Sequence, residues 1–171
     1  MNDFIVEKIE NLDDSKDYYS QDLYGEIIRD IYRADKLYVA LSPAKFDPES
    51  GTGVPGIFTK DGFPAIYIFT NEDAARNWSV HYGNIKIALL NNHEITKNPF
   101  NSLFQTAAAL GAKCAFVNEG LKFLCFPIKD IFSFTDAAKD PEMILESTDT
   151  ESMIKEVEAN GLDFNPAKAV I

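Results

Sequence analysis

The spacing of apolar residues predicts a succession of helices and strands along the chain. Residues 22–34 repeat apolar side chains at the helical period, with charged residues on the other side. The apolar positions of this helix are Leu23, Ile27, Ile28 and Ile31. Residues 36–41 form an apolar run of strand length, and the prolines and glycines of residues 42–56 favour a loop.

Residues 57–59 and 63–70 are predicted strands that flank Asp61-Gly62. This dipeptide tolerates the positive φ angles of a tight turn, so the two strands are expected to form an antiparallel hairpin. The remaining predicted elements are a helix over residues 71–79 capped by Thr70, a strand over 85–90, a helix from Asn98-Pro99 to Gly111, and a helix near 150–160. Hairpins require antiparallel pairs and helical connections allow parallel ones. We therefore expect an α+β fold, in which a mixed β-sheet with two hairpins packs against helices.

The second hairpin is predicted from residues 114–118 and 121–127, which flank Glu119-Gly120. A two-residue loop at that point would place Cys114 directly opposite Cys125. The pair then has three interpretations: a redox disulfide, half of a zinc site, or two reduced thiols that pack as small apolar groups. The third is favoured because no cation near either thiol is evident and the C-x-x-C spacing of a zinc site is missing.

The charge divides the chain of 171 residues into three segments and gives it a net charge of −11. Residues 1–35 and 129–171 each hold ten acidic and four basic residues, whereas residues 36–128 are close to neutral. We interpret 36–128 as the folded kernel of one globular unit, with an acidic helical flank at 1–35 and an acidic helical extension at 129–171. Such an acidic chain repels phosphates, which argues against nucleic acid and anionic membranes as partners. Two cysteines and the absence of a signal-like N-terminus favour the cytoplasm.

Three segments partly match the sequence motifs of known sites, but each lacks the flanking elements or ligand spacing that such a site requires. Residues 51–56 match G-x-G-x-x-G, but no strand directly precedes them and a strand, rather than a helix, is expected to follow. His93-Glu94 begins a zinc-protease motif, but Lys97 stands where the second histidine is needed. The acidic pairs Asp13-Asp14 and Asp47-Glu49 lack the ligand spacing of a calcium loop. We therefore expect no catalytic residues, no metal site and no cofactor.

Four aromatic residues near a predicted junction of strand and helix form the candidate binding site. They are Tyr67, Phe69, Trp78 and Tyr82. Tyrosine and tryptophan combine a large apolar area with a polar tip, which suits protein interfaces. Packing within the core is the alternative interpretation of the same residues, and it is the commoner fate of such side chains.

An ordered set of three segments resembles the N-terminal domain of the SseB family, named for enhanced serine sensitivity. The segments are the strand at 36–41, residues 61–78 from Asp-Gly to Trp, and residues 111–118 ending in Asn. The resemblance covers residues 36–128 and departs from the family at Glu119, where a proline is usual. It implies a bacterial cytoplasmic protein and supplies no catalytic residues.

These observations together predict a non-catalytic binding or adaptor module that recognises a protein partner. The acidic flanks favour a basic partner, and a second copy of the chain is a further candidate. One alternative is an acidic inhibitor or immunity-type protein that covers the basic groove of a toxin. The other is an enzyme with an unrecognised carboxylate or thiol site.

Overall fold

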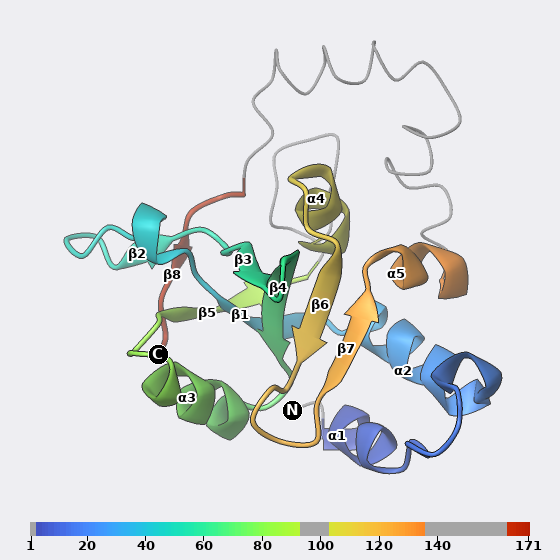
Figure 1. Ribbon diagram of the computed structural model, residues 1–171. Helices are drawn as coiled ribbons and strands as arrows, with labels where there is room; N and C mark the ends of the chain where they lie inside the picture. Colours follow the sequence, from blue (N-terminus) through green and yellow to red (C-terminus); the bar gives the residue numbers. More distant parts are fainter. Residues whose placement is uncertain (1–2, 93–102, 136–163) are drawn as a thin grey trace, which may run out of the picture.

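The computed structural model describes residues 3–92, 103–135 and 164–171, which form a β-sheet with helices on both faces (Figure 1). The helices are α1 (Asp3–Glu10), α2 (Asp22–Arg33), α3 (Glu72–His81), α4 (Leu103–Ala109) and α5 (Lys129–Phe134), with short 3-10 turns η1 (Tyr18–Ser20) and η2 (Pro43–Lys45). The strands are β1 (Lys36–Ala40), β2 (Thr52–Gly53), β3 (Phe58–Lys60), β4 (Phe63–Phe69), β5 (Ile87–Asn91), β6 (Cys114–Val117), β7 (Leu124–Pro127) and β8 (Ala167–Lys168).

The main sheet has six strands in the order β5-β1-β4-β6-β7, with β3 paired to β4. Strands β4 and β6 run parallel, and the other pairs of this sheet are antiparallel. This mixture confirms the predicted α+β fold. Strand β7 forms one edge, and β8 pairs with β2 in a small second sheet.

Alternate residues of each strand point to opposite faces, which separates the core into two clusters. On the first face, aliphatic strand residues such as Val39, Ile68 and Val117 pack against α1, α2, α4 and α5. Phe104 and Phe126 are fully buried there. On the second face, Tyr67 and Phe69 pack against Ala75 and Trp78 of α3. The predicted flanks take part in the first core, since Ile5, Ile27 and Ile131 belong to it.

The first predicted hairpin is confirmed. Strand β3 pairs with β4 so that Lys60 faces Phe63, and both Asp61 and Gly62 have positive φ angles, 52° and 85°. Helix α3 is also confirmed, but its cap is Asn71 rather than Thr70. The Asn71 carboxamide accepts hydrogen bonds from the amides of Asp73 and Ala74.

The register of the second hairpin differs by two residues from the predicted one. Cys114 lies opposite Pro127, and Phe116 lies opposite Cys125, so the two cysteines are diagonal rather than direct neighbours. The loop is longer than two residues because Asn118 and Lys122 are held elsewhere. Asn118 bonds to Thr70, and the Lys122 ammonium donates to the carbonyls of Glu10 and Leu12.

Residues 42–56 contain turns and two short pairings. Asp47 and Thr52 close a turn, and Thr52–Gly53 pairs with β8. The three glycines of the G-x-G-x-x-G letters lie in this connection, and strand β3 rather than a helix follows, which confirms the loop interpretation. The start of the helix predicted at Asn98-Pro99, the motif at His93-Glu94 and the helix near 150–160 lie outside the described residues.

Helix α4 ends as predicted at Gly111, whose φ of 104° closes a Schellman turn. In that turn the amide of Ala112 donates to the carbonyl of Ala107 and the amide of Gly111 to that of Ala108. None of the helices in the described part of the chain has both the length and the apolar character needed to span a bilayer.

Candidate functional site

Among the described residues, a single helix covers only part of the second face of the sheet. Helix α3 packs on β1 and β4, whereas apolar side chains over β6 and β7 remain accessible. We call this accessible region the open face and define it by Phe63, Cys114, Phe116, Leu121, Phe123 and Cys125. Phe63 is 61% exposed, and Leu121 and Phe123 are each 45% exposed. Such a group of exposed apolar side chains is typical of a contact surface.

The four aromatic residues predicted as the binding site lie at the covered edge of this face. Tyr67 and Phe69 are buried beneath α3 and Trp78 is buried on that helix, whereas Tyr82 is 46% exposed. The ring of Tyr82 stacks on Trp78 with the ring centroids 4.8 Å apart. Packing in the core therefore accounts for three of the four residues, and Tyr82 is the one of the four that is accessible to solvent. Whether the set binds a partner stays a prediction.

Glu119 joins these aromatic residues to the open face. Its carboxylate is buried and accepts hydrogen bonds from the Trp78 indole Nε1 at 3.3 Å and from the Tyr82 hydroxyl at 3.2 Å. It also forms a close ion pair with the Lys60 ammonium. Three donors, from β3 and from the C-terminal part of α3 with its cap, thus satisfy a charge that would otherwise be costly to bury.

Lys60 lies between this carboxylate and two aromatic rings. Its Nζ is 4.8 Å from the centroid of Phe116 and 6.0 Å from that of Tyr67. The hydrogen bond to Glu119 raises the pKa of Lys60 above its usual value, more than partial burial lowers it. Lys60 therefore carries a positive charge that Glu119 neutralises and the rings stabilise.

Asn118 sets the position of Glu119. Its φ angle of 59° lies in the left-handed region, which asparagine tolerates better than most residues. The carboxamide accepts from the Thr70 amide and donates to the Thr70 hydroxyl, both at 2.9 Å. These bonds tie the end of β6 to the end of β4, and the following residue, Glu119, is thereby directed at Trp78.

Two hollows lie on this side of the molecule. The larger, of about 710 Å³, is lined by Phe63, both cysteines and Pro127, with Lys113 and Lys129 at its margin. The smaller, of about 450 Å³, lies between the C-terminal end of α3 and the β6–β7 loop. Its walls are formed by Asn77, Trp78, His81, Tyr82, Glu119, Gly120, Leu121 and Phe123. Both are open and mostly apolar in their side chains, which suits docking better than enclosure of a substrate.

The two thiols face the larger hollow and are free. Although Cys125 is exposed as a residue, crowding around its sulfur removes water that would solvate a thiolate. This burial, with a smaller contribution from Cys114, raises the pKa of Cys125 to about 11. Burial also raises the pKa of Cys114. Such thiols are poor nucleophiles at neutral pH. The favoured interpretation of two buried packing groups is met only in part, because Cys114 is half-buried and Cys125 is exposed.

The Glu119 carboxylate is fully engaged by its three donors. Within residues 3–92, 103–135 and 164–171, no three His, Cys, Asp or Glu side chains gather as metal ligands would. The sequence gives no signal for the pairing of Glu119 with Lys60. Glu119 has the pattern of a turn residue, and Lys60 lies 59 positions away from it.

Comparisons with known proteins identify no family for this chain. No family model matches the chain. No curated protein and no solved structure matches it either.

Proposed function

We propose that this protein is a non-catalytic binding module that recognises a protein partner through the open face. The observation that carries the proposal is the half-covered sheet, on which Phe63, Leu121 and Phe123 are accessible beside a rigid aromatic support. Large apolar side chains on rigid elements provide the central contacts of protein interfaces. The proposal includes the SseB-like character of residues 36–128 and a cytoplasmic location.

The rigidity of the support comes from the Glu119 bonds and the stacked rings. The Tyr67 ring lies parallel to that of Phe116 with centroids 5.0 Å apart, and Phe116 in turn contacts Phe123. A partner that covers Phe123 would therefore find it already ordered, which lowers the entropic cost of association. The margin of the larger hollow holds Lys113 and Lys129 and no carboxylate. This face thus fits an apolar segment, and the acidic charge of the chain lies elsewhere.

The proposal is tested by affinity capture with the whole chain and two variants. The first replaces Phe63 and Phe123 by serine on the open face. The second, a matched control, replaces Val80, which is 66% exposed on α3 outside that face, by serine. We expect a protein bound by the native chain and by the Val80→Ser control to be lost with the double variant. Recovery of the same proteins with all three chains, or of none, would contradict the proposal.

A further inference from the structure

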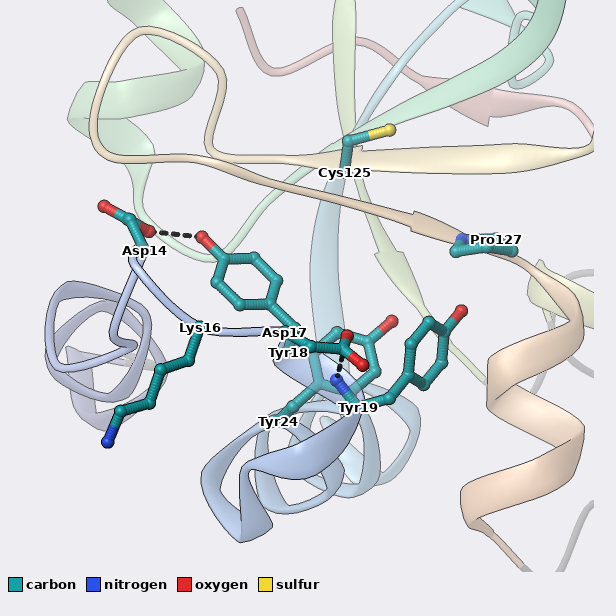
Figure 2. Close-up of a pocket in the computed structure, with 8 residues that line it drawn as sticks. All are labelled: Asp14, Lys16, Asp17, Tyr18, Tyr19, Tyr24, Cys125 and Pro127. Atoms are coloured by element: carbon teal, nitrogen blue, oxygen red, sulfur yellow. Dashed lines mark hydrogen bonds between the residues drawn. The ribbon is translucent and has the colours of Figure 1, made fainter.

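A further groove, separate from the two hollows described above, runs along the outer edge of β7, on the side away from the cysteine thiols. We call it the tyrosine groove. Its volume is about 340 Å³, and it is lined by Asp14, Lys16, Asp17, Tyr18, Tyr19, Tyr24 and the edge of β7 at Cys125 and Pro127 (Figure 2). The Cys125 thiol points away from the three tyrosines in this view, so β7 presents its backbone to the groove.

The three tyrosine rings gather on one wall. The ring centroid of Tyr24 is 6.0 Å from that of Tyr18 and 5.4 Å from that of Tyr19. Tyr24 is buried and Tyr19 is 55% exposed, so the wall reaches from the core to solvent. Aromatic rings grouped in this way attract organic cations through the negative potential of their faces.

A buried carboxylate lies behind this wall. Asp130 accepts hydrogen bonds from the hydroxyls of Tyr24, at 2.5 Å, and Tyr19, at 2.9 Å. Among the described side chains, none forms an ion pair with it. Both hydroxyl donors are neutral, so within the described part of the chain no cation is paired with the carboxylate behind the rings, which adds to their attraction for a cation.

The cations near the groove already have partners. Lys16 points away from the rings (Figure 2) and lies 3.7 Å from Asp13. Lys122 lies 3.3 Å from Asp14, whose carboxylate also accepts from Tyr18. Asp17 accepts the backbone amide of Tyr19 at 3.1 Å and has no described cation beside it. The groove therefore has a net negative charge.

The β7 edge adds hydrogen-bonding groups to the opposite wall. The amide of Ile128 donates to the carbonyl of Lys113, so β7 bonds to β6 through residues 124, 126 and 128. The amide and carbonyl of Cys125 consequently point outward. No described strand pairs with this edge, and Pro127 has no amide, which restricts an added strand to a short pairing around Cys125.

We propose that the tyrosine groove binds an arginine or lysine side chain of a protein partner, presented on a short extended segment that pairs with β7 at Cys125. The rings and carboxylates supply the attraction for the cation, and the strand edge supplies the orientation. The acidic balance of residues 1–35 favours the same class of partner. The proposal does not depend on the open face, because the two surfaces share only the Cys125 residue.

The test is an NMR titration of the whole chain with acetyl-Ala-Arg-Ala-amide. The matched probe is the same peptide with citrulline, the neutral isostere of arginine. We expect the arginine peptide to shift the Cys125 amide and the tyrosine ring signals, with at least tenfold weaker binding of the citrulline peptide. Tyr19→Leu and Asp17→Asn should each weaken the arginine peptide several-fold. Val80→Ser, on the exposed side of α3 outside the groove, should leave its binding unchanged.

Three outcomes would overturn the proposal: equal binding of the two peptides, an unchanged affinity for the arginine peptide in the Tyr19→Leu chain, or no shift at millimolar peptide. The Phe63→Ser/Phe123→Ser variant separates this result from the proposed function. Arginine binding that survives in that variant while partner capture is lost supports both proposals. If the native chain does not bind the arginine peptide, the proposal for the tyrosine groove is contradicted and the proposed function is not affected.

Discussion

The two faces of the sheet differ in the side chains that build them and in what covers them. The first face is mostly aliphatic and lies under four of the described helices, so its residues are removed from water. The second is mostly aromatic, carries one described helix, and has a partly buried ion pair at the margin of its accessible half. The comparison separates two roles: the first face stabilises the fold, and the second holds an exposed surface in one arrangement.

The largest expected effect comes from truncating the first face. Phe126→Ala should lower the free energy of unfolding by about 3 to 5 kcal/mol, because the ring is fully buried and its removal leaves a cavity. Phe123→Ala on the open face is the matched control and should cost less than about 1 kcal/mol, since that ring is already accessible. Urea unfolding followed by circular dichroism measures both values. Equal losses would erase the distinction between the faces.

Removing the buried carboxylate tests the support of the open face. Glu119→Ala should cost about 2 to 3 kcal/mol, because Trp78 loses its acceptor and the Lys60 ammonium loses its counter-charge. Glu119→Gln keeps an acceptor for the indole and should lose less. Chemical denaturation gives the values, and the fluorescence of Trp78, the sole tryptophan, reports the local change. A neutral effect of Glu119→Ala would show that the carboxylate does not hold the support together.

The third prediction concerns the corner that directs Glu119. Asn118→Ala should cost about 2 kcal/mol, since it removes two hydrogen bonds to Thr70 and places alanine at a positive φ angle. Asn118→Gly removes the same bonds without the strain and should cost about 1 kcal/mol. Thermal unfolding of the two variants resolves this difference. A glycine variant less stable than the alanine variant would contradict the backbone argument.

The smallest expected effect on stability concerns Cys125, whose rate of alkylation should depend strongly on pH. Burial, the largest cause, raises the pKa of Cys125 to about 11, so its alkylation by iodoacetamide in the native chain, assigned to Cys125 by mass spectrometry, should rise about tenfold per pH unit from pH 8 to 10. The folded chain holds this proton more tightly than the unfolded chain, so the contribution to stability is lost as the pH rises from about 9 towards 11. A rate that levels off near pH 8.5 would show an ordinary, fully solvated thiol.

The sequence predicted those elements whose signals are local. Asp61-Gly62 fixed the first hairpin because both residues of its turn need positive φ angles. The second hairpin could not be placed by its own residues. Its register follows from bonds between Asn118 and Thr70, 48 positions apart, and from Lys122 reaching carbonyls near the end of α1.

The sequence singled out aromatic residues at the covered edge of the open face, but neither the accessible rings of that face nor the charges beside it. Whether the four predicted residues bind a partner stays a prediction. Aromatic residues beside a strand and a helix identified Trp78 and Tyr82, which stack as neighbours on α3. Glu119 had no local signal, since its donors come from β3 and α3. The tyrosine groove was equally hidden: Asp130 lies 106 positions from Tyr24, and only the fold brings them together.

The most direct test of the account is the solvent accessibility of phenylalanine rings in the whole chain. A soluble nitroxide broadens the NMR signals of rings that meet solvent and leaves those of buried rings sharp. We expect strong broadening of Phe63 and Phe123 on the open face and none of Phe126 on the first face, which the helices cover. If Phe63 and Phe123 are protected to the same degree as Phe126, the half-covered sheet and the binding surface derived from it are both contradicted.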